Sequence, residues 1–386
     1  MTRRHFMFAS LAATALGQSR HPGRKIVIVL VDGFGMDYLE ASDMPNLKRI
    51  GKEGGLKAGR CVIPSVTNVN NASLVTGSFP IEHGITTNYH YDRRTKTSSE
   101  MESAEFLLKP TIFEKAKKFG LRTALVSSKD KVRTLCSRGA DIVVSAEKPE
   151  SEWIQRIGQK EKMYSADVNY WTFRAARLIL KSDSVDLMYI STTDYMMHTY
   201  GPEESPSLEH LHRLDKMLAD IVDDHPRIEI YLTADHGMNA KREGINPALI
   251  LREKSILSEA IPIIRDAHRT HHNNLGGACY VYLDRISDKS RAIEILTQTE
   301  GVEEVFDSKR AAGEFHLYPD RIGDLFVLAK KDYVFGELEK GREPVKVRSH
   351  GSRHESRIPL LVYGAKVDMS QYSYNLDLTR NLQLKG

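Results

Sequence analysis

Runs of apolar residues recur along the chain, and each ends at a polar residue or a glycine. The clearest run, from Ile26 to Val31, has six consecutive apolar side chains and leads directly into Asp32 and Gly33. Runs of the same form occupy residues 121–128, 186–194, 228–237 and 358–364. Unbroken apolar runs of this length are typical of strands that are buried on both faces of a sheet.

Helical patterns separate these strands. Residues 46–54 and 111–119 are predicted to be short helices, and Ser205 and Pro206 are predicted to be the N-cap and first-turn residues of a longer one. Apolar residues recur along that longer helix at helical spacing, at Leu211, Leu214, Leu218, Ile221 and Val222. Strands that alternate with helices predict an α/β fold, with a mostly parallel central sheet and helices on both faces.

Residues 241–345 interrupt this alternation. They contain an alternating strand-like run at 273–285 and a charged helix-like stretch at 292–299. We predict an inserted α+β cap that excludes water and sets specificity, with a catalytic core formed by residues 24–240 and 346–386. His271 and His272 lie in the cap and match no expected ligand position, so they are left unassigned.

The first eighteen residues have the pattern of an export signal. Arg3 and Arg4 precede an apolar stretch from Phe6 to Leu16, and small residues follow it. Paired arginines favour a twin-arginine signal, which implies a periplasmic protein. An unprocessed apolar N-terminus is the alternative, but the stretch is short for a membrane span. Removal of residues 1–18 would change the net charge from +4 to 4 − 2 = +2.

The composition excludes several classes of protein. The chain of 386 residues is 41% hydrophobic and 27% charged, which is ordinary for a globular protein. Because there is no strongly basic stretch, we expect no nucleic-acid partner, and because apolar runs recur throughout, we expect no long disordered region. The three cysteines, at positions 61, 136 and 279, are too few and too widely spaced for a disulfide framework and are predicted to be buried small residues.

Carboxylates follow three of the predicted strands. Asp32, Asp194 and Asp235 are expected to meet at the edge formed by the carboxyl ends of the strands. A single aspartate there is often only a turn residue, but three in one cleft would repel one another unless a cation lay between them. His198, four residues after Asp194, and His236 add nitrogen ligands, so the pattern favours a zinc site. His350 and His354 are further candidates.

Thr67 is a candidate nucleophile. It stands in a segment rich in serine and asparagine, ahead of a helix predicted at residues 70–76. Backbone N–H groups at a helix N-terminus favour an anion, and a metal-bound hydroxyl would lose its proton more easily. The alternative is that Thr67 only caps the helix.

The motifs VDGFG, PSVTNVNNASLVTG, HGITTNYHYD, DYMMH, TADHGM and RSHG follow one another in the order found in the alkaline phosphatase superfamily. The chain resembles the branch that contains phosphonoacetate hydrolase and the nucleotide pyrophosphatases/phosphodiesterases. The resemblance implies two zinc ions, one held by Asp194, His198 and His350. It implies that the other is held by Asp32, Asp235, His236 and the Thr67 hydroxyl. His350 is preferred to His354 because the family ligand precedes a glycine.

The stretch SSKDKVRTL resembles phosphonoacetate hydrolase more closely, because Lys129 and Lys131 match a Lys-Asp-Lys segment that reaches the substrate there. Asn88 matches the asparagine that binds a phosphonyl oxygen. The resemblance thus implies cleavage of the C–P bond of phosphonoacetate through a phosphothreonine at Thr67. A phosphodiesterase or nucleotide pyrophosphatase is the alternative, in which the lysines form a solvated loop, and an inactive binding protein is a third. The expected partner is a small anionic phosphonate or phosphate ester, and the sequence leaves a homodimer open.

Overall fold

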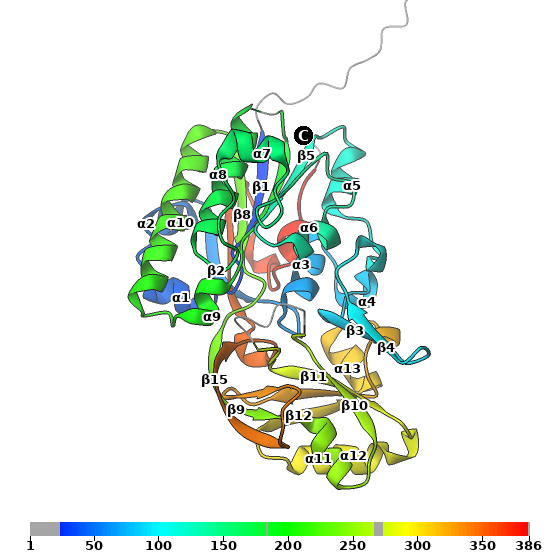
Figure 1. The fold of residues 1–386 in the computed structure, drawn as a ribbon. Helices are drawn as coiled ribbons and strands as arrows, with labels where there is room; N and C mark the ends of the chain where they lie inside the picture. The colour runs from blue at the N-terminus through cyan, green and yellow to red at the C-terminus, as the bar shows by residue number, and fades with distance from the viewer. Residues whose placement is uncertain (1–23, 183, 266–272, 385–386) are drawn as a thin grey trace, which may run out of the picture.

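The computed structural model describes residues 24–182, 184–265 and 273–384 (Figure 1). The predicted export signal at residues 1–18 lies outside this part of the chain, as do His271 and His272. Among the described residues, no helix combines the length and the apolar character needed to cross a membrane.

A seven-stranded sheet forms the centre of the larger part of the molecule. All five apolar runs of the sequence become strands of this sheet. In spatial order the strands are β2 (Gly55–Arg60), β16 (Arg357–Tyr363), β8 (Ile228–Thr233), β1 (Lys25–Leu30), β7 (Leu187–Ser191), β5 (Thr123–Ser127) and β6 (Ile142–Ser145).

The sheet is mostly parallel. Strand β1 pairs in parallel with both β7 and β8, and its last residue, Leu30, lies opposite Ser191 and Thr233, which are the last residues of those strands. The three strands therefore end at the same level, and the segments that follow them leave from one edge. Strand β16 differs, because it runs antiparallel to both β8 and β2.

Helices cover both faces of the central sheet (Figure 1). One face is covered by α1 (Met36–Ala41), α2 (Pro45–Glu53), α7 (Ser151–Ile157), α8 (Asp167–Ser182) and α10 (Ser205–Asp224). The other is covered by α3 (Thr67–Thr76), α4 (Pro80–His83), α5 (Ile112–Lys117), α6 (Asp130–Cys136) and α14 (Asp377–Arg380). The N-cap residue of α10 was predicted to be Ser205, but it is Glu204, and Ser205 is the first helical residue.

Residues between β8 and β16 build a smaller α+β part, which lies beside the edge of the central sheet where α3 and α9 (Tyr195–Thr199) begin (Figure 1). Its four-stranded sheet has the order β10 (Ser258–Pro262), β11 (Ala278–Leu283), β13 (Leu325–Ala329), β12 (Val302–Asp307). Its three-stranded sheet has the order β14 (Tyr333–Phe335), β9 (Asn239–Ile245), β15 (Arg342–Ser349). Its helices are α11 (Pro247–Glu253), α12 (Lys289–Gln298) and α13 (Ser308–Phe315).

The predicted fold class, an α/β core with an inserted α+β part, is therefore confirmed. The division of the chain into separate domains stays a prediction. A two-stranded hairpin of β3 (Tyr89–Asp92) and β4 (Thr97–Glu100) completes the list of strands in the described residues. The three cysteines are free and buried, as the sequence predicts.

All ten residues of helix α3 are buried. The helix begins at Thr67 rather than at residue 70, and the N-cap position belongs to Val66. The alternative in which Thr67 only caps the helix is therefore wrong. Its hydroxyl lies instead in the first turn, where backbone N–H groups have no partner within the helix.

Candidate metal centre and active site

Three aspartates meet at the edge where β1, β7 and β8 end. Asp32 and Asp235 each lie two residues beyond their strand, and Asp194 lies three residues beyond β7. All three are at most 1% exposed. Backbone N–H groups hold Asp235, whose Oδ1 accepts hydrogen bonds from Gly33 at 3.1 Å and His236 at 3.0 Å. The common level of the strand ends thus places three buried carboxylates side by side.

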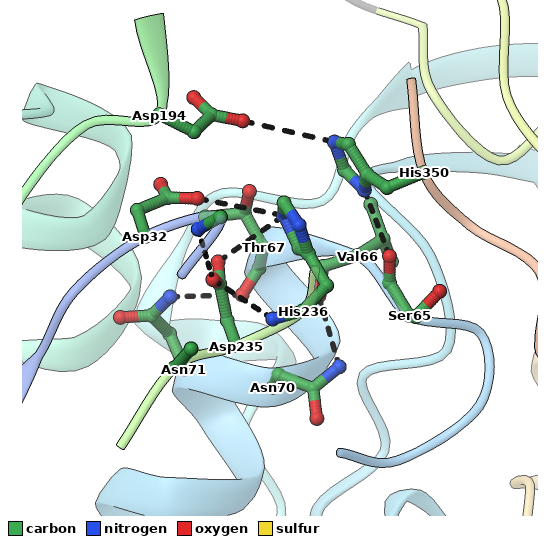
Figure 2. A network of polar contacts seen from close by, with 12 residues as sticks. Asp32, Ser65, Val66, Thr67, Asn70, Asn71, Asp194, Asp235, His236 and His350 are labelled. Atoms are coloured by element: carbon green, nitrogen blue, oxygen red, sulfur yellow. Dashed lines mark hydrogen bonds and ion pairs between the residues drawn. The ribbon is translucent and has the colours of Figure 1, made fainter. Parts of the chain in front are cut away.

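Three histidines face these carboxylates in the same tautomer. The Nδ1 atoms of His198, His236 and His350 lie 2.7, 2.9 and 2.8 Å from backbone carbonyls of Arg348, Gly237 and Ser65. Because a carbonyl oxygen can only accept, each Nδ1 must carry the proton. In the neutral imidazole each Nε2 is then a lone-pair donor that lies near a carboxylate, the arrangement typical of metal-binding histidines. Figure 2 shows this for His236 and His350.

Those Nε2 atoms lie against carboxylate oxygens. His198 Nε2 is 2.9 Å from Asp194 Oδ2, and His236 Nε2 is 3.4 Å from one oxygen each of Asp32 and Asp235. Within the described chain, Asp32 Oδ1, Asp235 Oδ2 and His236 Nε2 are buried without a hydrogen-bond partner. Two acceptors at such distances repel unless a cation lies between them, so the residues fit divalent metal ions.

The geometry separates the ligands into two overlapping groups. One group contains Asp32, Asp235 and His236, and the other contains Asp194, His236 and His350. The ring of His236 stacks on that of His350 at 3.4 Å, which explains why it belongs to both groups. His198 joins the second group through its contact with Asp194. Six of the seven ligands implied by the resemblance therefore lie in one place, although the assignment of the seven to two particular ions stays a prediction.

Burial keeps two of these histidines neutral. It lowers the pKa of His350 well below its usual value, and the neighbouring imidazoles of His236 and His198 lower it further. Burial also lowers the pKa of His236, although the charges of Asp32 and Asp194 oppose the shift. Neutral imidazoles retain the lone pairs that a metal needs.

Lys129 occupies a different place from the solvated loop that the alternative interpretation expects. It is the N-cap residue of α6 and is 6% exposed. Its Nζ donates to Asp32 Oδ2 at 2.6 Å and to Asp194 Oδ1 at 2.7 Å. Burial lowers the pKa of Lys129, but the charges of Asp194 and Asp32 outweigh it and raise that pKa above its usual value. The ammonium group therefore stays charged beside the metal ligands.

A pocket of about 310 Å³ opens above the ligands. Thr67, Asn88, Lys129 and Lys131 line it together with Asp194, His198 and His350. The sequence motifs that contribute these residues are far apart in the chain, yet the fold brings them to one cavity. Met163, Tyr164 and Ile264 also line the pocket, and Ile264 comes from the inserted part.

Asn88 presents its amide as a donor. Its Oδ1 accepts the backbone N–H of Asn68 at 3.0 Å, so the two N–H bonds of Nδ2 are left for another acceptor. Thr67, which lines the same pocket, is 2% exposed. A hydroxyl and an amide donor thus border one space above the metal ligands.

Sequence reasoning missed the asparagines that hold α3 in place. Asn71 Nδ2 donates to the carbonyl of Thr67 at 3.0 Å (Figure 2). Tyr189 on β7 donates its hydroxyl to Asn71 Oδ1 at 2.7 Å. Asn70 Oδ1 accepts the backbone N–H of Val62 at 2.7 Å. The signal was present, because most buried amides have hydrogen-bond partners, so the asparagines of a buried helix are expected to bond to neighbouring segments.

His354 lies away from the metal ligands, as expected for a residue outside the metal site. Its Nε2 is 2.5 Å from Glu303 of the inserted part, and the side chain is 33% exposed. His350, in contrast, is 3% exposed and lies 3.8 Å from Asp194.

An α/β sheet whose carboxyl edge carries a candidate Asp/His metal centre and a threonine at a helix N-terminus is the arrangement of an alkaline phosphatase-like protein. The model of the type I phosphodiesterase / nucleotide pyrophosphatase family matches residues 26–353. The chain belongs to that family.

Solved and curated relatives agree with this assignment. Phosphonoacetate hydrolase from Sinorhizobium meliloti 1021, in complex with phosphonoacetate, is 31% identical, with a TM-score of 0.85 over 93% of this chain and 95% of that one. Venom phosphodiesterase of Naja atra is 26% identical over 229 residues, which are 56% of this chain and 26% of the relative. Human ENPP5, at 16% identity and a TM-score of 0.65, supports the fold alone. The prediction of a hydrolytic enzyme is confirmed at the level of the family.

Proposed function

We propose that the protein hydrolyses the C–P bond of phosphonoacetate, giving acetate and phosphate. The observation that carries this proposal is that Thr67, Asn88 and Lys131 line one pocket together with the proposed metal ligands. A small substrate with a dianionic phosphonate and a carboxylate needs positive charge beyond that of the metals. The likeness to a phosphonoacetate hydrolase over nearly the whole chain supports the same substrate.

The residues of the chain have separate tasks in this reaction. Thr67 Oγ1 attacks phosphorus, the P–C bond breaks, and its electron pair leaves with the carbon of the acetate group. Asn88 Nδ2 donates to a phosphonyl oxygen, and Lys131 neutralises the substrate carboxylate into which the departing charge spreads. The proton lost by the Thr67 hydroxyl goes to solvent, and the carbon takes up a proton from solvent to give acetate. Water then cleaves the phosphothreonine to release phosphate and restore Thr67.

The seven ligands Asp32, Thr67, Asp194, His198, Asp235, His236 and His350 would hold two divalent ions, for which we propose zinc. Bound zinc would supply positive charge that favours ionised Thr67 and offsets the charge on the phosphorus oxygens. Neutral Nε2 donors and carboxylates in one buried site suit zinc among the common divalent metals.

A phosphodiesterase or nucleotide pyrophosphatase activity is the second candidate. The family model and the apolar side chains of Met163, Tyr164 and Ile264 in the pocket wall favour it. A diester with an aromatic group would gain contact area there, whereas phosphonoacetate has no group to place against them.

The test compares phosphate release from phosphonoacetate with cleavage of bis(p-nitrophenyl) phosphate, using zinc-loaded protein and p-nitrophenyl phosphate as a monoester reference. We expect phosphonoacetate to be the best substrate. Lys131→Ala should raise its KM about 10- to 100-fold and leave diester cleavage almost unchanged. Lys117→Ala, which removes an exposed lysine paired with Asp141, is the matched control. If the protein instead cleaved the diester faster than phosphonoacetate, and Lys131→Ala did not change its activity, the protein would be a phosphodiesterase.

A further inference from the structure

Lys241 and Glu355 form a fully buried ion pair outside the pocket. Lys241 lies on β9, where the inserted part begins, and Glu355 lies in the short 3-10 helix Arg353–Glu355 that precedes β16. Their Nζ and Oε1 atoms are 2.8 Å apart, and both side chains are 0% exposed. A buried ion pair of this kind contributes little more to stability than an apolar pair of the same shape. Stability alone therefore does not explain why these two residues are charged.

Glu355 is saturated with hydrogen bonds. Its Oε1 also accepts from Asn239 Nδ2 at 2.7 Å, and its Oε2 accepts from both the backbone N–H and the hydroxyl of Ser352, at 3.0 and 2.6 Å. Lys241 Nζ also donates to the carbonyl of Lys331 at 2.7 Å. Two segments of the inserted part, around Lys241 and Lys331, are thereby tied to one carboxylate of the core.

From Glu355 the contacts lead to the His350 loop. Ser65 donates its hydroxyl to the carbonyl of Ser352 at 2.7 Å and accepts the N–H of Gly351 at 3.0 Å. The carbonyl of Ser65 in turn accepts the Nδ1 proton of His350 at 2.8 Å (Figure 2). The bond that fixes the tautomer of His350 therefore belongs to the same network as the buried pair.

The backbone of Glu355 reaches the other ligand loop. Its carbonyl accepts the N–H of Gly237 at 2.7 Å, and Gly237 directly follows His236. The Nδ1 atom of His236 bonds the carbonyl of that same glycine at 2.9 Å. One residue thus joins the loops of His350 and His236, whose rings stack on one another in the site.

We propose that Glu355 and Lys241 are positioning residues. They fix the loops of His350 and His236 relative to each other and so set the metal affinity of the site. The inference rests on the proposed function, since it takes the site to be a metal centre. It also gives the inserted part a role at the metals, because Lys241 and Lys331 anchor it to the residue that aligns the ligands. Outer partners of metal-binding histidines commonly have this effect.

The test is calorimetric titration of zinc into the full-length protein after its metal has been removed. We expect Glu355→Gln and Lys241→Met each to weaken zinc binding about 10- to 100-fold. Because the two residues act as a unit, the double variant should lose little more than Glu355→Gln alone. At saturating zinc, the KM for substrate should stay near the wild-type value. Methionine fills the space of the lysine stem, so Lys241→Met tests the pair even where Glu355→Gln folds poorly.

Glu243→Gln is the matched control. Glu243 lies on the same strand and pairs with Arg342 within the inserted part, so its loss should leave zinc affinity unchanged. The inference would be overturned if variants of the buried pair lowered thermal stability but bound zinc within about twofold of wild type. The pair would then have only a structural role. The titration needs no substrate. Wild-type protein that binds zinc without cleaving phosphonoacetate would therefore contradict the proposed function alone.

Discussion

Asp194 divides its two carboxylate oxygens between Lys129 and the histidines. Oδ1 accepts from Lys129 Nζ at 2.7 Å, and Oδ2 faces His198 Nε2 at 2.9 Å. Asp32 repeats the arrangement, with Oδ2 on Lys129 at 2.6 Å and Oδ1 3.4 Å from His236. Lys129 therefore orients one carboxylate from each ligand group, and its charge lies at the floor of the pocket, beneath the proposed position of the substrate.

This arrangement predicts a metal-dependent stability defect in Lys129→Met. Loss of the ammonium leaves Asp32 and Asp194 buried without their shared cation, which should destabilise the metal-free protein by roughly 3–5 kcal/mol. Bound zinc would supply the missing positive charge, so the defect should shrink in zinc-loaded protein. Chemical unfolding in EDTA and in zinc measures both values. An equal loss in the two conditions would mean that Lys129 does not compensate the ligand charges.

Thr67 is predicted to be essential for turnover but not for the integrity of the site. Thr67→Ala should lower kcat by at least about a thousandfold, because no other hydroxyl is expected to replace the nucleophile. Zinc binding through Asp194, His198 and His350 should persist, and Thr67→Ser should retain part of the activity. Mass spectrometry of acid-quenched wild-type protein should find phosphate on the peptide with Thr67. Full activity of Thr67→Ala would refute a covalent mechanism.

His350 and His354 form a matched pair for testing the metal assignment. His350→Ala removes a buried Nε2 that faces Asp194, so one zinc should bind at least about tenfold more weakly. His354→Ala removes only a partly exposed contact with Glu303 and should bind zinc like wild type. Titration of both variants with a competing chelator distinguishes them. The reverse result would place His354 in the metal site.

Much of the fold was predictable because strands that are buried on both faces of a parallel sheet consist of unbroken apolar runs. The run from Ile26 to Val31 and its counterparts all became strands of the central sheet. The direction of β16 was not predictable, because a strand buried on both faces has the same apolar pattern whichever way it runs. The start of α3 was misplaced for a related reason, since its asparagines bond to neighbouring segments that a local pattern does not contain.

The candidate site was predictable where residues follow strands, because the end of a parallel strand has a known place in the sheet. Asp32 and Asp235 are of this kind. Lys129 also follows a strand, since it lies two residues beyond β5, but its contact with two aspartates depends on the direction of its long side chain, which no spacing in the sequence encodes. The pair of Lys241 and Glu355 was missed because its members are separated by the whole inserted part.

The last prediction concerns stability in acid. Burial and the charge of Arg321 lower the pKa of His83 to about 3, and its Nδ1 accepts the backbone N–H of Ile85 at 3.1 Å. In the unfolded chain the same histidine binds a proton below pH 6.5. The unfolded state therefore binds more protons between pH 6.5 and 3, and stability must fall as the pH drops through that window.

From pH 7.5 to pH 5, His83 alone should cost about 2 kcal/mol of unfolding free energy. Urea unfolding in EDTA at both pH values measures this loss without a contribution from bound metal. His83→Gln should reduce the difference between the two pH values by that amount, whereas His212→Gln, a half-buried position on α10, should leave it unchanged. If His83→Gln kept the full pH dependence of the wild type, the acid sensitivity would have to arise from other groups, such as the histidines of the metal site.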